Sequence, residues 1–287
     1  MSNFVPSRQL ENAILADLVY HSKGETVKPP PGWVPVGEPK YDEKTGYYAE
    51  VWGKPLLNGQ GQPMPGGYSE LSIVNRGTVF SEPGRNTTAP HIDLQANWTN
   101  DRINTLGADV NIVLGRDSGY INAAIDFTKS IVEKYGSVPV GLVGQSLGGA
   151  TSIAVAVSFL KSGFSNITAH TYNALSYGAS NAGITPEQAA LMAPYITNYY
   201  VSNEILTQNF GLDIAQFAFQ GTPIGTTVYT PSEPSVGNGV LDRLQNFQKI
   251  HDAPAAVASL LRNEYGDTLP QEALDYMRAR YPDTATT

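Results

Sequence analysis

The chain has 287 residues, of which 41% are hydrophobic, so it is long enough to bury a sizeable core in one large domain or two small ones. Its formal net charge of −8 and its charged fraction of only 15% argue against a nucleic-acid partner. The absence of cysteine excludes disulfides, thiolate metal ligands and a cysteine nucleophile.

The N-terminal segment, MSNFVPSRQLENAILADLVYH, places apolar side chains on one face of an amphipathic helix. These side chains are Leu10, Ile14, Leu15, Leu18 and Val19. The segment has no basic stretch followed by an apolar core, so an ordinary signal peptide is not expected. No stretch of about 18 uninterrupted apolar residues occurs, so no transmembrane segment is predicted. We therefore expect a soluble protein, either cytoplasmic or exported by a signal-independent route.

Two strands that are expected to pair follow a stretch rich in proline and glycine at 28–39. The first covers 45–52 and the second 68–78, and the segment 57–67 between them is predicted to be a loop because it is rich in glycine and proline. From about residue 92 helical patterns alternate with apolar strands. This alternation predicts a mostly parallel sheet that is covered by helices on both faces.

The expected helices are 92–106, 119–134, about 147–162, 186–192, about 253–264 and 270–280, and the expected strands are 138–144, 167–172, 196–202 and 226–230. No internal repeat and no linker is visible, which favours a single α/β domain. This domain covers 1–287, with an N-terminal helix and hairpin at 8–80, an α/β core at 92–264 and a C-terminal helix at 270–280.

A serine stands between two glycines where the strand at 138–144 meets the next helix, in the segment VGLVGQSLGGATSI. A nucleophile elbow needs small residues two positions before and two after its serine, because strand and helix would otherwise collide. Gly144 and Gly148 meet this need around Ser146, and the helix N-terminus adds backbone N–H groups and a positive dipole end. The alternative is an ordinary tight turn. The apolar strand before the serine and the small-residue helix after it favour a nucleophile.

A serine nucleophile needs a base, and in this kind of fold the order along the chain is nucleophile, acid, histidine. His21 and His91 precede Ser146 and fit that order poorly. His170 lies inside a predicted strand with no carboxylate between it and the serine, so it is predicted to be structural. His251 remains, just before a predicted helix, and it is the candidate base. Its alternative interpretation is a surface histidine in a polar loop.

The candidate acid is Glu204, which directly follows the strand that ends at 202. Ligand sites of open α/β sheets gather at the carboxyl ends of the strands, where the serine is also expected. The choice of acid is among five carboxylates: Glu187, Glu204, Asp213, Glu233 and Asp242. Asp213, in an apolar segment, is the second choice, and an ordinary solvated charge is the alternative for Glu204.

Two donors are needed for an oxyanion hole. The N–H of Leu147, the residue after the serine, is one candidate. The N–H of Thr78, at the end of the second predicted strand, is the other, together with its hydroxyl. A plain hairpin end is the alternative at that position.

Four segments together resemble the class 3 lipase family of α/β-hydrolases, which includes fungal triglyceride lipases and bacterial phospholipases A1. They are RGT at 76–78, GQSLGG at 144–149, NYYVSNEIL at 198–206 and the segment around His251. LADLVYHS at 15–22 also resembles the first helix of bacterial members. The chain departs from the family in having Gln145 where His is usual and Glu204 where Asp is usual.

The resemblance implies an α/β-hydrolase fold with a mostly parallel central sheet flanked by helices. It also implies a triad of Ser146, Glu204 and His251 and an oxyanion hole formed by Thr78 and Leu147. Members of the family attack ester carbonyls of acyl lipids without a cofactor. No metal site is expected either, because the histidines show no ligand spacing with carboxylates.

We therefore expect a lipase or phospholipase A1 that makes transient contact with a lipid interface. A carboxylesterase for short-chain or aromatic esters and a catalytically silent binding module remain open. The segments 80–90 and 206–219 are candidate lid and pocket segments, the second being equally compatible with buried core.

Overall fold

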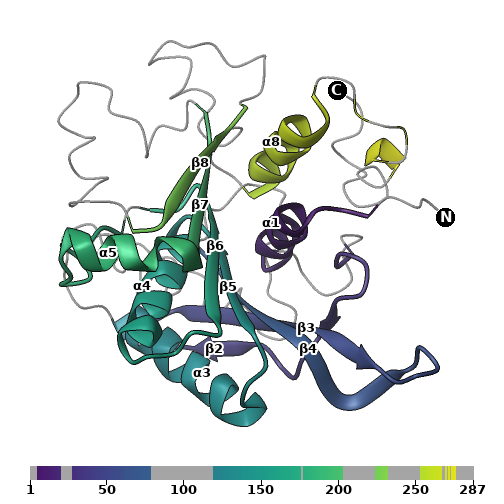
Figure 1. Cartoon of the computed structure of the whole chain (residues 1–287), viewed down its shortest axis with the longest axis horizontal. Helices are drawn as coiled ribbons and strands as arrows, with labels where there is room; N and C mark the ends of the chain where they lie inside the picture. The colour runs from purple at the N-terminus through teal and green to yellow at the C-terminus, as the bar shows by residue number, and fades with distance from the viewer. Residues whose placement is uncertain are drawn as a thin grey trace.

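The computed structural model describes residues 5–20, 28–78, 119–175, 177–202, 224–231 and 253–266, together with 269, 271 and 273–275. In this part of the chain one sheet has the strand order β1-β3-β4-β5-β6-β7-β8, with β2 paired to β3 (Figure 1). The pairings among β1 to β4 are antiparallel, and those from β4 to β8 are parallel. The predicted sheet, mostly parallel in its central part, is confirmed.

The strands are β1 (Val34–Pro35), β2 (Lys40–Asp42), β3 (Tyr47–Leu57), β4 (Pro63–Asn75), β5 (Val140–Gln145), β6 (Ile167–Tyr172), β7 (Ile196–Val201) and β8 (Thr226–Thr230). The helices are α1 (Arg8–Leu18), α3 (Gly119–Tyr135), α4 (Leu147–Lys161), α5 (Pro186–Met192), the 3₁₀ turn η1 (Ala193–Tyr195) and α8 (Ala253–Tyr265). The helix predicted at 92–106 and most of the one predicted at 270–280 lie outside the described residues.

The hairpin β3–β4 is longer than the sequence predicts. β3 continues to Leu57 and β4 begins at Pro63, so the prediction of a loop over 57–67 was wrong for most of that segment. Within the described chain, β5 pairs with β4 only along 71–75, so the earlier part of β4 has a free edge on that side. A proline is tolerated on a free edge because its missing N–H breaks no ladder hydrogen bond. The second strand also ends earlier than predicted, at Asn75.

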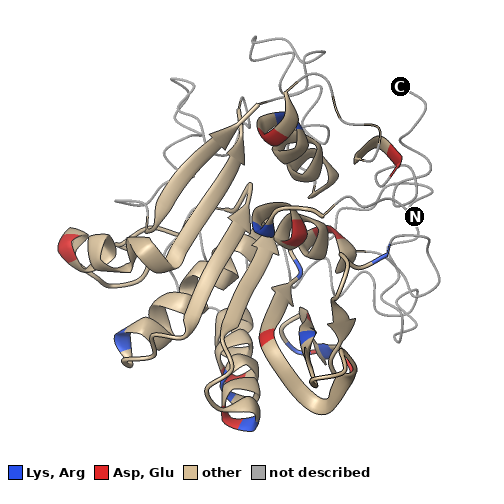
Figure 2. Ribbon diagram, turned by 45° about the vertical axis from the view of Figure 1, so that its right-hand side comes forward, with Lys and Arg blue, Asp and Glu red and all other residues tan. Residues whose placement is uncertain are grey.

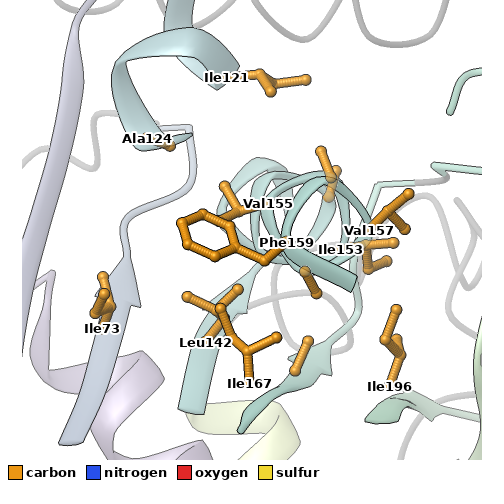
Figure 3. Close-up of a cluster of buried hydrophobic side chains, with 14 of the residues drawn as sticks. Ile73, Ile121, Ala124, Leu142, Ile153, Val155, Val157, Phe159, Ile167 and Ile196 are labelled. Atoms are coloured by element: carbon orange, nitrogen blue, oxygen red, sulfur yellow. The ribbon is translucent and has the colours of Figure 1, made fainter. Parts of the chain in front are cut away.

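Helices cover both faces of the sheet (Figure 1). On one face lie α3, α4 and α5, and α4 is buried against β5 and β6 along almost its whole length. Figure 3 shows the apolar side chains that meet there: Ile73, Leu142, Ile167 and Ile196 from the strands, and Ile153, Val155, Val157 and Phe159 from α4. Of the helices in the described ranges, none is both long and apolar enough to cross a bilayer.

On the other face α1 packs against β5, β6 and α8. Its first turn is capped by Ser7, whose hydroxyl accepts a hydrogen bond from the Leu10 N–H at 3.3 Å. The predicted apolar face is buried, as expected, but so are Glu11, Asn12 and Asp17. The helix is therefore enclosed on more sides than an amphipathic pattern requires, because α8 and the hairpin lie beside it as well as the sheet.

Among the described residues, charged side chains are absent from the parallel strands β5 to β8 and lie mainly on the helices and the hairpin (Figure 2). One network joins α1 to the hairpin: Arg8 contacts Glu70 at 2.7 Å, and Lys54 contacts Glu11 at 2.8 Å. Both cations also lie over the ring of Trp33, at 4.8 and 5.1 Å from its centroid. These contacts link α1 to the hairpin and to Trp33.

Candidate active site

Ser146 lies at the turn between β5 and α4, with φ 56° and ψ −127°. A non-glycine residue with such a backbone conformation carries a strain of about 1–3 kcal/mol. The residue is only 4% exposed. An ordinary turn would relieve the strain by having glycine at this position. A serine held here at a cost favours the nucleophile elbow over the plain turn.

The two glycines around the serine leave no space for a side chain. A Cβ atom on Gly144 would lie 2.3 Å from the carbonyl carbon and oxygen of Gly148. A Cβ atom on Gly148 would lie 2.1 Å from the carbonyl oxygen of Asn75. Strand β5, helix α4 and the end of β4 therefore meet at backbone contact around Ser146.

The segment 76–78 that follows β4 lies directly beside the serine. A Cβ atom on Gly77 would be 2.5 Å from the Gln145 carbonyl oxygen and 3.3 Å from the Ser146 Cβ. Thr78, the next residue, is 5% exposed, and Leu147 is fully buried. The backbone at Gly77 and Thr78 and the backbone at Leu147 therefore both lie next to Ser146, the candidate nucleophile.

A buried hydrogen-bond network fixes the end of β4 to α4. The Asn75 side chain accepts from the Tyr47 hydroxyl at 2.8 Å and donates to the Ser152 Oγ at 2.9 Å. Ser152 in turn donates to the Gly148 carbonyl at 2.8 Å. These partners are 28 and 77 positions apart in the sequence, so they leave no local pattern that would predict them.

A second turn, at 173–175, packs against the other side of the elbow. The Leu175 N–H donates to the Ser146 carbonyl at 3.0 Å, and a Cβ atom on Gly149 would lie 2.6 Å from that of Ala174. Asn173 has φ 43°, and its side-chain oxygen accepts from the Val201 N–H at 2.9 Å. The elbow is thereby tied to the carboxyl end of β7, the strand that precedes Glu204 in the sequence.

His170 lies within β6 and stacks on Tyr199, with ring centroids 6.5 Å apart. Burial, aided by the positive charge of Arg8, lowers its pKa from 6.5 to about 4, so the ring is neutral at pH 7. Its Nδ1 has no hydrogen-bond partner among the described residues. These surroundings agree with the predicted structural role.

The remaining predicted partners of the serine lie outside the described residues. These are Glu204, Asp213 and His251, together with the candidate lid and pocket segments at 80–90 and 206–219. Glu204 comes three positions after the end of β7 (204 − 201), and His251 two positions before the start of α8 (253 − 251). In the described ranges, no three His, Asp or Glu side chains come together as metal ligands would.

A mostly parallel sheet between two helical layers, with a strained serine at a central strand-to-helix turn, is the arrangement of one large class of enzymes. The chain has an α/β-hydrolase fold. The structure is similar to Lip2 lipase from Yarrowia lipolytica, with a TM-score of 0.42 and 12% identity over 77% of each chain. It is also similar to a triacylglycerol lipase from Penicillium expansum, with a TM-score of 0.39 and 14% identity over 78% of this chain and 79% of that one.

No family model matches the chain. No curated protein sequence matches it either.

Proposed function

We propose that the chain is a serine carboxylic-ester hydrolase acting on acyl lipids, as a triacylglycerol lipase or a phospholipase A1. Ser146 is the nucleophile, His251 the general base and Glu204 the acid that orients it, with Asp213 as the second choice for the acid. Leu147 and Thr78 supply the oxyanion-hole donors. No cofactor takes part in this chemistry.

The observation that carries the proposal is the strained backbone of Ser146, at φ 56°, with segment 76–78 packed against it. In a nucleophile elbow this backbone conformation presents the serine hydroxyl at the end of the strand, and the first turn of the helix supplies N–H groups that have no partner within the helix. Donors that are fixed before the reaction begins stabilise a developing oxyanion without reorganisation. Such an arrangement serves acyl transfer.

In the proposed reaction, Ser146 Oγ attacks the ester carbonyl carbon while His251 takes the hydroxyl proton. The tetrahedral intermediate places its oxyanion between the N–H groups of Leu147 and Thr78. Its collapse breaks the ester bond, and His251 returns the proton to the leaving alcohol. Water, activated by His251, then hydrolyses the acyl-enzyme and releases the fatty acid.

The acyl-lipid substrate is proposed from the resemblance of four motifs to class 3 lipases, so it needs a direct test. We would measure hydrolysis of p-nitrophenyl esters from acetyl to palmitoyl by the wild type and by Ser146→Ala. Loss of the hydroxyl is expected to lower kcat by roughly 10⁴–10⁶. Retained turnover by purified Ser146→Ala would refute the mechanism.

The chain-length profile separates the remaining alternatives. Serine-dependent activity that persists to palmitoyl supports the lipid hydrolase, and phospholipids labelled at each acyl position would then define the bond cleaved. Activity confined to the shortest esters indicates a carboxylesterase. A folded wild type that neither hydrolyses any ester nor reacts with a fluorophosphonate indicates a silent binding module.

A further inference from the structure

The peptide group between Arg76 and Gly77 is held at both of its polar ends by tyrosine hydroxyls. The Tyr120 hydroxyl donates to the Arg76 carbonyl oxygen at 2.5 Å. The Tyr20 hydroxyl accepts from the Gly77 N–H at 2.8 Å. Tyr20 follows α1 and Tyr120 belongs to the first turn of α3, so the two contacts come from the helical layers on opposite faces of the sheet.

Tyr20 also connects this peptide to the elbow. Its hydroxyl donates to the side-chain oxygen of Gln145 at 2.9 Å, and Gln145 immediately precedes Ser146. A phenol has one O–H and two lone pairs, so it can accept from Gly77 and donate to Gln145 at the same time. Gln145 is 4% exposed, so water competes little for this bond. The position at which the resemblance expects histidine here holds a neutral acceptor for Tyr20.

Gly77 is the residue that most needs such a restraint. It has no space for a Cβ atom, because the Tyr20 oxygen would lie 2.4 Å from it. Glycine also has the widest choice of backbone angles, and these angles set the direction of the next N–H, that of Thr78. The Gly77 N–H is already engaged by Tyr20, which leaves it unsuited to bind an oxyanion.

We propose that Tyr20 and Tyr120 are positioning residues, which fix the Arg76–Gly77 peptide so that the Thr78 N–H faces the oxyanion formed at Ser146. This inference rests on the proposed function, and it adds residues that touch no substrate. A donor must lie within a few tenths of an ångström of its working position, and a shift of about 1 Å can cost about 10²-fold in rate. Removal of either hydroxyl should therefore affect the transition state more than the bound substrate.

The test compares Tyr20→Phe, Tyr120→Phe and the double variant with the wild type on the best p-nitrophenyl ester. We expect each single variant to lower kcat by about tenfold, with KM within about twofold of the wild type, because donor placement is only partly lost. The inhibition constant of an alkyl boronic acid, which forms a tetrahedral adduct with the serine, should rise by the same factor as kcat/KM falls.

The double variant tests whether the two hydroxyls act on one peptide. Once one end is free, loss of the second contact should cost less, so the combined fall in kcat should be well below the product of the two single effects. Gln145→Met removes the side-chain oxygen that accepts from Tyr20 but leaves Tyr20 in place. It should lower kcat, as Tyr20→Phe does.

The matched control is Tyr172→Phe. The Tyr172 hydroxyl also contacts α1, through the Gln9 carbonyl at 2.6 Å, and among the described residues no hydrogen bond joins it to segment 76–78. The Tyr172 backbone oxygen accepts from the Ser146 N–H at 3.2 Å, and the substitution keeps that bond. We expect its melting temperature to fall about as much as that of Tyr20→Phe, while its kcat stays at the wild-type value. A purely structural role for Tyr20 would make the two variants alike in both measurements.

The outcomes separate this inference from the proposed function. An active wild type with an equally active Tyr20→Phe, or with fully multiplicative effects in the double variant, overturns the inference alone. A folded wild type without serine-dependent hydrolysis or fluorophosphonate labelling overturns the proposed function and the inference with it. A fall in kcat without a matching change in boronic acid affinity would also overturn the inference.

Discussion

Replacing Gly148 by alanine tests whether the elbow depends on backbone contact between α4 and the end of β4. The added Cβ would lie 2.1 Å from the Asn75 carbonyl oxygen. Because Cβ atoms essentially never approach other atoms within 3.0 Å, helix and strand would have to separate by 0.9 Å (3.0 − 2.1). Asn75 is poorly placed to move, since Tyr47 and Ser152 hold its side chain.

Two opposing contributions decide whether the substitution raises or lowers the free energy of unfolding. In an unhindered helix, glycine to alanine would raise the free energy of unfolding by about 1 kcal/mol. Overpacking against fixed backbone costs about 3 kcal/mol. The net loss of about 2 kcal/mol should lower the melting temperature by roughly 4–8 °C. A shift of about 1 Å between Ser146 and segment 76–78 should also lower kcat by about 10²-fold.

Circular dichroism melting curves and ester hydrolysis measure the two effects. Gly59→Ala is the matched control, because a Cβ atom there meets nothing within 4 Å and its φ is not in the left-handed region. We expect that control to melt and to turn over substrate as the wild type does. A Gly148→Ala protein that is as stable and as active as the wild type would refute the close-packing argument.

Two further predictions concern the buried His170 and the choice between Glu204 and Asp213 as the acid of the triad. The pKa of His170 is about 4 in the folded chain against 6.5 for an unperturbed histidine, so the unfolded state binds more protons between these values. The free energy of unfolding should therefore fall by about 3 kcal/mol as the pH drops from 6.5 to 4, which urea titrations of the wild type and His170→Gln would measure. Identical pH profiles for the two proteins would contradict this. For the acid, Glu204→Gln should lower kcat by about 10³–10⁴-fold and Asp213→Asn by no more than a few fold; the reverse result would assign the role to Asp213.

The order and type of the elements could be predicted from the sequence where local signals agree. Helix 186–192 is bounded as predicted, because Thr185 caps it, Gln188 completes a capping box and Pro186 fits its first turn. The strands at 167–172 and 226–230 also have the predicted bounds. The prediction of a loop at 57–67 was wrong for most of the segment because it rested on the glycine and proline content. The free edge of the hairpin tolerates these residues within a strand.

Part of the candidate site could likewise be predicted from the sequence, and part could not. The need for glycine at 144 and 148 follows from the crowding of strand and helix, so a sequence pattern can express it. The partners of segment 76–78 leave no such pattern. Tyr20 contacts Gly77 across 57 positions, and Tyr120 contacts Arg76 across 44, and only the folded sheet brings α1 and α3 to the same peptide. A tyrosine near the end of a helix has the same local sequence pattern whether or not its hydroxyl contacts a functional site.

The central place of β5 has a consequence for how activity would be lost on heating. This strand is paired on both sides, with β4 and β6, and is enclosed by α4 and α1 on its two faces. Amide protons of core strands commonly exchange with solvent only through openings close to global unfolding, so we expect slow exchange in β5. Ser146 follows the last residue of that strand. We therefore expect local fraying of the outer strands to leave the backbone geometry of Ser146 intact, and that geometry to be lost only when the central sheet itself unfolds.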